Sequence, residues 1–167
     1  MRCAALILAS LFVSTGCASA QQADVPAVCR DLPPGDHCGF DATRDAAEDI
    51  RAAQDKAAQN GLKSLIVFGA NWCHDSRALA GHLLKPRFDD LLSEHYSVAY
   101  VDVGRKDRNI DLARAFGLDR IRGTPTVIVA DSEGRVLNLD TAPAWRNAAS
   151  RTEDEIYDYL ERFAAME

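Results

Sequence analysis

The sequence predicts an α/β fold in which a mixed central sheet lies between two layers of helices. Helical and strand patterns alternate along the chain, and continuous apolar runs at 64–70 and 98–103 fit strands buried on both faces. A turn sequence at 131–134 then joins two strand patterns into an antiparallel hairpin. Parallel pairing followed by a hairpin gives a mixed sheet with helices on both faces.

The elements follow from local patterns in chain order. The expected elements are a helix at 43–60, a strand at 64–70, helices at 76–84 and near 88–92, a strand at 98–103, a helix at 111–116, hairpin strands at 126–130 and 135–139, and a final helix from Thr152. Asp41 or Thr43 is a suitable N-cap for the first helix, and Asn60-Gly61 a common helix end. Thr152 with Glu155 has the pattern of a capping box. Residues 141–150, with Trp145 and Arg146, are interpreted as an insertion that either packs on the domain or binds a ligand.

Residues 1–20 have the composition of a secretory signal. A short basic start precedes an apolar run at 3–13, and a small-x-small sequence ends at Ala20. The apolar run is about half of the ~20 residues that a membrane-spanning helix needs. Cleavage after Ala20 is one interpretation, and acylation of Cys17 in a sequence resembling a bacterial lipobox is the other. We expect an exported protein of the bacterial periplasm or envelope, either free or lipid-anchored.

The 167 residues suit one domain, which we place at 43–167 after an N-terminal extension at 21–42. There are 19 basic and 25 acidic residues, for a net charge of −6, and no basic run. This balance argues against a nucleic-acid partner, and against membrane contact other than through a lipid anchor. No phosphate-binding loop or cluster of metal ligands stands out, so we expect neither a cofactor nor a metal.

Cys29 and Cys38 flank a stretch rich in turn-forming residues, which allows the two thiols to meet. In an oxidising compartment such a pair predicts a disulfide. A closed loop this short stabilises a fold by roughly 2–3 kcal/mol on the chain-entropy argument. The pair is interpreted either as a staple for the extension or as a redox pair that exchanges with Cys73. A zinc half-site that includes His37 is a third interpretation, but four good ligands are not in view.

The sequence Trp-Cys-His-Asp-Ser at 72–76 carries the clearest chemistry. Cys73 lies between the end of a buried strand and the start of a helix. A helix N-terminus presents free N–H groups and about half a positive charge, and both favour the thiolate. Because the thiolate is the nucleophile, this position predicts a reactive cysteine.

Two separated segments resemble the thioredoxin family. Residues 65–73 are a strand that leads into a Trp-Cys pair, and residues 121–126, Ile-Arg-Gly-Thr-Pro-Thr, look like the family's loop with a cis proline. The spacing from Cys73 to Pro125 is near that of the family, and the element order agrees over 43–165. The resemblance therefore implies a thioredoxin-like three-layer α/β/α domain.

The resemblance also implies roles for particular residues. Cys73 would be the attacking thiolate, and Trp72, His74, Thr124 and Pro125 would line the substrate site. Pro125 would be cis and lie against the thiol, while the backbone of Thr124 would pair with an extended peptide.

Two positions depart from the family pattern. Ser76 stands where the family has its second cysteine, and Val67 stands where it has a buried acid. An internal disulfide at this site is therefore impossible, and any exchange must use Cys73 alone. Ser76 either donates a hydrogen bond to the thiolate or serves only as a polar residue at the helix start.

The favoured hypothesis is thiol–disulfide exchange, of the reductase or isomerase type, through the single thiolate of Cys73. The partners would be disulfide-containing or extended protein segments, and an external thiol, such as a small-molecule thiol, would release the mixed disulfide. The alternative is a redox-inactive module that binds extended peptide segments in the envelope. A metal or peroxide role through residues 73–75 is a third and weaker hypothesis.

Overall fold

The structure is a computed structural model, and it describes residues 38–166. The predicted signal peptide at 1–20, the alternative acylation site Cys17, and Cys29 and His37 lie outside the described residues. The helices, strands and short 3₁₀ helices (η) are α1 (Ala46–Asn60), β1 (Lys63–Gly69), α2 (His74–Leu83), η2 (Pro86–Phe88), α3 (Asp89–His95), β2 (Tyr96–Asp102), α4 (Ile110–Ala115), β3 (Thr126–Ala130), η3 (Ala142–Trp145), η4 (Ala148–Ser150) and α5 (Glu153–Ala164). Within this range no helix is both long and apolar enough to cross a membrane.

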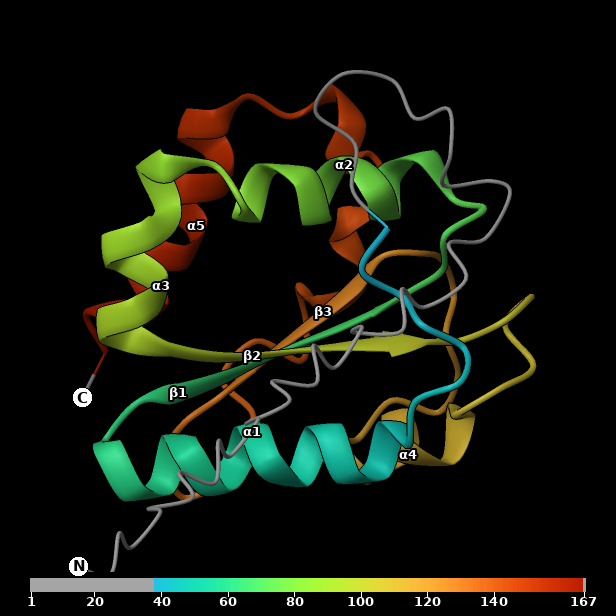
Figure 1. Ribbon diagram of the computed structural model, residues 1–167, viewed down its shortest axis with the longest axis horizontal. Coiled ribbons are helices and arrows are strands. Elements are labelled where there is room, and N and C mark those ends of the chain that lie inside the picture. Colours follow the sequence, from blue (N-terminus) through green and yellow to red (C-terminus); the bar gives the residue numbers. More distant parts are fainter. Residues whose placement is uncertain (1–37, 167) are drawn as a thin grey trace, which may run out of the picture.

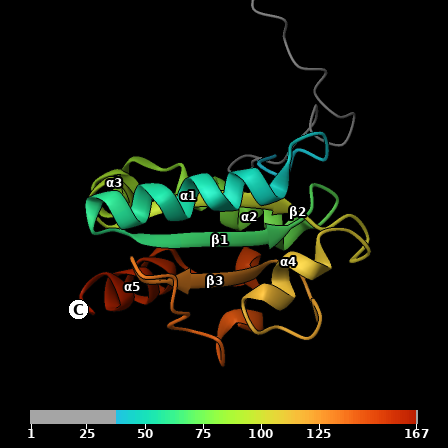
Figure 2. The ribbon, with the colours of Figure 1, turned by 90° about the horizontal axis from the view of Figure 1, so that it is seen from below.

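The three strands form one sheet in the order β2-β1-β3. β1 and β2 run parallel, with Leu65 opposite Val98, whereas β1 and β3 run antiparallel, with Val67 opposite Val127. Figure 1 shows α1 and α4 on one face of the sheet and α2, α3 and α5 on the other. Figure 2 shows the order of the strands, with α1 lying across β2 and β1. The architecture is therefore three-layer α/β/α with a mixed sheet, as the sequence predicted.

Each face of the sheet has its own apolar core, because alternate residues of a strand point to opposite faces. Leu65 and Val67 of β1 pack with side chains of α2, α3 and α5. Ile66 and Phe68 pack with side chains of α1 and α4. Coverage on both faces explains the continuous apolar run of β1. The central strand, β1, ends shortly before the start of α2, where Cys73 lies.

The predicted hairpin forms only in part. After β3 the chain turns back, but Val136 makes a single antiparallel bridge to the end of β3, so residues 135–139 do not form a strand. The side chain of Asn138 supplies bonds that a strand would make. Its Oδ1 accepts from the backbone N–H of Val129 at 2.8 Å, and its Nδ2 donates to the carbonyl of Val127 at 2.8 Å.

Of the two helix caps that the sequence predicted, one was wrong and the other is confirmed. α1 begins after Asp45, whose carboxylate accepts hydrogen bonds from two N–H groups of the first turn. The prediction of Asp41 or Thr43 as the cap was wrong, because Asp41 instead accepts bonds from the backbone and hydroxyl of Thr43. α5 begins at the predicted capping box, in which Thr152 and Glu155 bond each other's backbone N–H groups.

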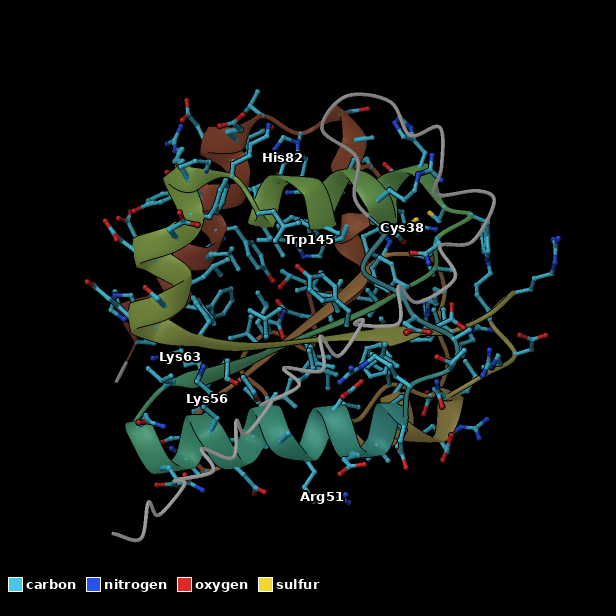
Figure 3. The ribbon with its side chains drawn as sticks, in the orientation of Figure 1. Cys38, Arg51, Lys56, Lys63, His82 and Trp145 are labelled. Carbon is cyan, nitrogen blue, oxygen red and sulfur yellow. The ribbon has the colours of Figure 1, made fainter. Side chains whose placement is uncertain are left out.

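Two segments outside the long elements pack into the core. Phe40 precedes the predicted domain boundary at residue 43, yet it is 1% exposed and packs edge-on against Tyr100, with centroids 5.6 Å apart. Trp145 in the predicted insertion is also 1% exposed and lies between α2 and the sheet (Figure 3). Its ring meets Tyr159 edge-on at 4.7 Å. The insertion is therefore packed against the domain, which was one of the two interpretations.

Candidate active site

Cys73 lies where β1 gives way to α2. A turn closed by a hydrogen bond from the Cys73 N–H to the carbonyl of Ala70, at 3.0 Å, follows the strand. Cys73 is the N-cap of α2, with extended backbone angles of φ −89° and ψ 119°, and its carbonyl accepts from the N–H of Arg77 at 3.1 Å. The partial positive charge of the helix start therefore lies at the residue that carries the thiol.

The thiol of Cys73 meets the loop before β3. It is a free, half-buried thiol, and its Sγ donates to the carbonyl oxygen of Thr124 at 3.3 Å. The peptide bond between Thr124 and Pro125 is cis, the geometry that the resemblance implied. Within residues 38–166 the backbone N–H of Thr124 has no hydrogen-bond partner. This N–H is therefore not used by the described part of the domain itself.

Trp72 forms the exposed side of the site, with 48% of its surface accessible. Its indole Nε1 donates to the carbonyl of Gly104 at 2.7 Å, which fixes the ring against the loop after β2. The carboxylate of Asp102 shapes this loop by accepting from the N–H of Gly104 at 3.1 Å and from Arg108 at 3.3 Å. Burial raises the pKa of Asp102, although these two donors act in the opposite direction.

Ser76 is fully buried in the first turn of α2 and faces away from solvent. Its Oγ makes no hydrogen bond to any residue of the described part of the chain. The Oγ lies 2.9 Å from the place that a Cβ on Gly69 would occupy, and the ring of Phe40 fills the same space. With the thiol protonated, Ser76 is therefore turned under the helix and is not bonded to Cys73.

The neighbours of Cys73 on α2 point in different directions. His74 is exposed at the start of the helix. The carboxylate of Asp75 accepts from the N–H of Ala149 at 2.9 Å and so joins α2 to the packed insertion. Among residues 38–166, no group of three His, Cys, Asp or Glu side chains is arranged to hold a metal ion. The position of the family's buried acid is filled by the fully buried Val67.

Asn71 is a site residue that the sequence did not reveal. Its side-chain oxygen accepts from the N–H of Phe40 at 3.1 Å, and its amide nitrogen donates to the carbonyl of Phe40 at 2.7 Å. The guanidinium of Arg77 holds the backbone carbonyl of Asn71 at 2.9 Å. Asn71 thus clamps the segment at 38–40 to the active-site turn. The only signal in the sequence is an amide side chain beside a Trp-Cys pair, and it does not show which residue the amide contacts.

Cys38 is disulfide-bonded and Cys73 is a free thiol, so the partner of Cys38 is another cysteine and lies outside the described residues. Cys38 is two residues before Phe40, whose backbone is bonded to Asn71 of the active-site turn, and Figure 3 labels Cys38 at that end of the molecule. The pairing of Cys38 with Cys29 stays a prediction, as does its role as a staple or a redox pair.

The sequence analysis also missed the contact between Gly123 and Arg146. The methylene groups of Arg146 lie where a side chain on Gly123 would be, directly before Thr124. A side chain on Gly123 would therefore force the Arg146 side chain to move away.

A family model described as a thioredoxin-like domain matches residues 50–142, a range that includes Cys73 and Pro125. This chain belongs to the thioredoxin-like family. The disulphide isomerase of Xylella fastidiosa Temecula1 is 32% identical to it, with alignment over 76% of this chain and 97% of that one and a TM-score of 0.71. A thioredoxin from Thermus thermophilus is 21% identical over 69% and 83% of the two chains, with a TM-score of 0.51, which shows likeness of fold alone. No curated protein sequence matches the chain.

This thioredoxin-like protein therefore brings together Trp72, Cys73 and the Thr124-Pro125 loop at one end of the sheet. His74 lies beside them at the surface, while Ser76 is directed into the interior. The arrangement offers one thiol, a helix start and, at Thr124, a backbone N–H that has no partner within residues 38–166.

Proposed function

We propose that the protein catalyses thiol–disulfide exchange on extended protein segments through Cys73 alone. The observation that carries this proposal is the position of the Cys73 thiol, at the start of α2 and 3.3 Å from the carbonyl of Thr124. Membership of the thioredoxin-like family and likeness to a disulphide isomerase support it.

The first step is attack by the Cys73 thiolate on one sulfur of a substrate disulfide. A new S–S bond forms as the old one breaks, and the second substrate sulfur leaves with the bonding electrons and takes up a proton. The positive end of α2 favours the thiolate, because the charge develops at the helix N-terminus. In the resting state the thiol proton is held by the carbonyl of Thr124.

The second step releases the substrate. A thiolate of the substrate attacks the substrate-side sulfur of the mixed disulfide, forms a new substrate disulfide and frees Cys73. No electrons are gained or lost overall, so the result is isomerisation. A small-molecule thiol performs the same attack and leaves the substrate joined to that thiol. Ser76 has no thiol to offer, so release always requires a third sulfur.

The substrate binds as an extended chain. Its backbone carbonyl accepts from the N–H of Thr124, and its apolar side chains lie on the exposed face of Trp72. Pairing of an extended peptide with an available backbone group is a common recognition mode.

The protein acts outside the cytoplasm, in the bacterial periplasm or envelope. The signal-like composition of residues 1–20 supports export, and the disulfide at Cys38 supports an oxidising compartment. Cleavage after Ala20 gives a free protein, and acylation at Cys17 gives an anchored one.

The test is recovery of a small secreted protein whose disulfides have been scrambled, with wild type compared to Cys73→Ala. The expected result is recovery with wild type and only the uncatalysed rate with Cys73→Ala, while both give the same circular dichroism. Retained catalysis in Cys73→Ala would overturn the single-thiolate mechanism. Absence of catalysis in wild type, together with binding of the unfolded chain, would favour the peptide-binding alternative.

A further inference from the structure

The loops on both sides of Cys73 carry basic side chains, although the chain has a net charge of −6. Three exposed residues define what we call the cationic rim: Arg105 and Lys106 in the loop after β2, and Arg146 directly after η3. They belong to segments far apart in sequence that meet at the same end of the sheet.

Arg105 and Lys106 lie on the side of Trp72. The carbonyl of Gly104 accepts the indole N–H of Trp72 at 2.7 Å, so the next two residues of the loop start from the edge of the active site. The loop has a defined shape, because Asp102 holds the N–H of Gly104 at 3.1 Å. Lys106 has a left-handed backbone with φ 69°, which marks a sharp turn at the exposed end of the loop.

Arg146 lies on the opposite side, at the cis-proline loop. Its methylene groups pass over Gly123, and the following residue, Thr124, accepts the hydrogen bond of the Cys73 thiol at 3.3 Å. Neighbouring Cα atoms are ~3.8 Å apart. The Arg146 side chain therefore crosses the chain one residue away from the group that contacts the thiol.

The rim has no anionic partner within residues 38–166, because no ion pair forms to Arg105, Lys106 or Arg146 there. Two carboxylates lie in the same loop as Arg105 and Lys106. Asp102 pairs with Arg108, whereas Asp107 accepts only from the neutral backbone N–H of Arg105 and so keeps its negative charge beside the rim.

Asp75 is the carboxylate closest in sequence to Cys73, and it accepts from the N–H of Ala149. Its charge opposes that of the rim at the thiol. The three rim cations outnumber the two opposing carboxylates, Asp75 and Asp107, by one.

We propose that the cationic rim selects substrates whose disulfide is flanked by carboxylates. This inference rests on the proposed function, since it names the class of disulfide that Cys73 attacks. The exchange step itself is unchanged: the Cys73 sulfur joins one substrate sulfur and the other leaves with the electron pair. Charges of one sign at a site raise encounter rates of the opposite sign by about 10- to 1000-fold, and the effect falls with salt. Because Asp75 and Asp107 leave the rim an excess of one positive charge, we expect at most about tenfold, the low end of that range.

The first experiment measures the rim without any disulfide. Cys73 is alkylated with iodoacetate, which is anionic, and with iodoacetamide, which is neutral, at one pH. Because both reagents react with the same thiolate, the ratio of their rates reports local charge and not thiolate content. The ratio should fall severalfold in Arg105→Gln/Lys106→Gln and in Arg146→Gln, and recover in Arg146→Lys. The matched control is Arg51→Gln, because Arg51 projects from α1 on the face of the sheet opposite α2 (Figure 3). A ratio equal in all variants would overturn the inference.

The second experiment uses two peptide disulfides of identical sequence except for Asp or Lys on each side of the cysteine. At low salt the Asp peptide should exchange faster than the Lys peptide, by up to about tenfold, and the difference should shrink at 0.5 M NaCl. Equal rates for the two peptides would overturn the charge selection and leave the exchange function intact. No exchange with either peptide would overturn the proposed function, and this inference with it.

Discussion

The clamp between Asn71 and Phe40 gives a prediction whose size follows from the structure. Asn71→Ala removes both side-chain hydrogen bonds to the backbone of Phe40, at 3.1 Å and 2.7 Å. Phe40 is 1% exposed, so its N–H and carbonyl would be left without water or protein partners. Each unsatisfied buried group costs about 1–3 kcal/mol. For the two groups we therefore expect the free energy of unfolding to fall by about 2–6 kcal/mol.

The assay is urea unfolding without reductant, so that the disulfide at Cys38 stays intact. The matched control is Asn60→Ala. Asn60 is exposed at the end of α1 and donates one hydrogen bond to the carbonyl of Lys56 at 2.8 Å. A change within about 0.5 kcal/mol is expected there.

The same variant should also slow exchange by Cys73 severalfold, because the turn that carries the thiol loses its contact with the segment at 38–40. If Asn71→Ala unfolds at the same urea concentration as Asn60→Ala, the clamp does not stabilise the fold. If it is destabilised but exchanges at the wild-type rate, the clamp does not position the thiol.

Three further predictions concern other parts of the structure. Trp145→Ala should lower the free energy of unfolding by about 3–5 kcal/mol. Trp145→Phe should lower it by less, since the indole N–H of Trp145 has no partner in the described structure. Equal urea midpoints for wild type and Trp145→Ala would show that the insertion is not part of the core. The backbone N–H of Thr152 lowers the pKa of Glu155 below its ordinary value of 4.5. The stabilising contribution of the Glu155 carboxylate is therefore complete above pH 4.5 and is lost as the pH falls through the folded-state pKa. A stability difference between wild type and Glu155→Ala that does not shrink in acid would contradict this. Ser76→Ala should keep exchange by Cys73 within about twofold, because the Oγ is turned under α2, whereas a tenfold loss would show that Ser76 supports the thiolate.

Local patterns in the sequence predicted most of the fold. The runs that became β1 and β2 are apolar because both faces of the sheet are covered, and that signal is local. The capping box at Thr152 depends only on residues within one turn. The position of Cys73 at a helix start was likewise visible as the junction of a strand pattern and a helical pattern.

The features that the sequence missed depend on contacts between distant segments. Residues 135–139 follow a turn sequence and are largely apolar, as in a hairpin strand, but the side chain of Asn138 bonds the buried backbone of β3, and the local pattern cannot reveal that exchange. The contact of Asn71 with Phe40 joins residues 31 positions apart. Arg146 reaches Gly123 only because the insertion folds back over the cis-proline loop.

The most direct test of the single-thiolate mechanism is the intact mass of the protein after mixing with a peptide disulfide and rapid quenching in acid. We predict an adduct of one peptide that maps to Cys73, grows within the exchange time, and disappears on addition of a thiol. No adduct at Cys73, or exchange at the same rate in Cys73→Ala, would contradict the mechanism.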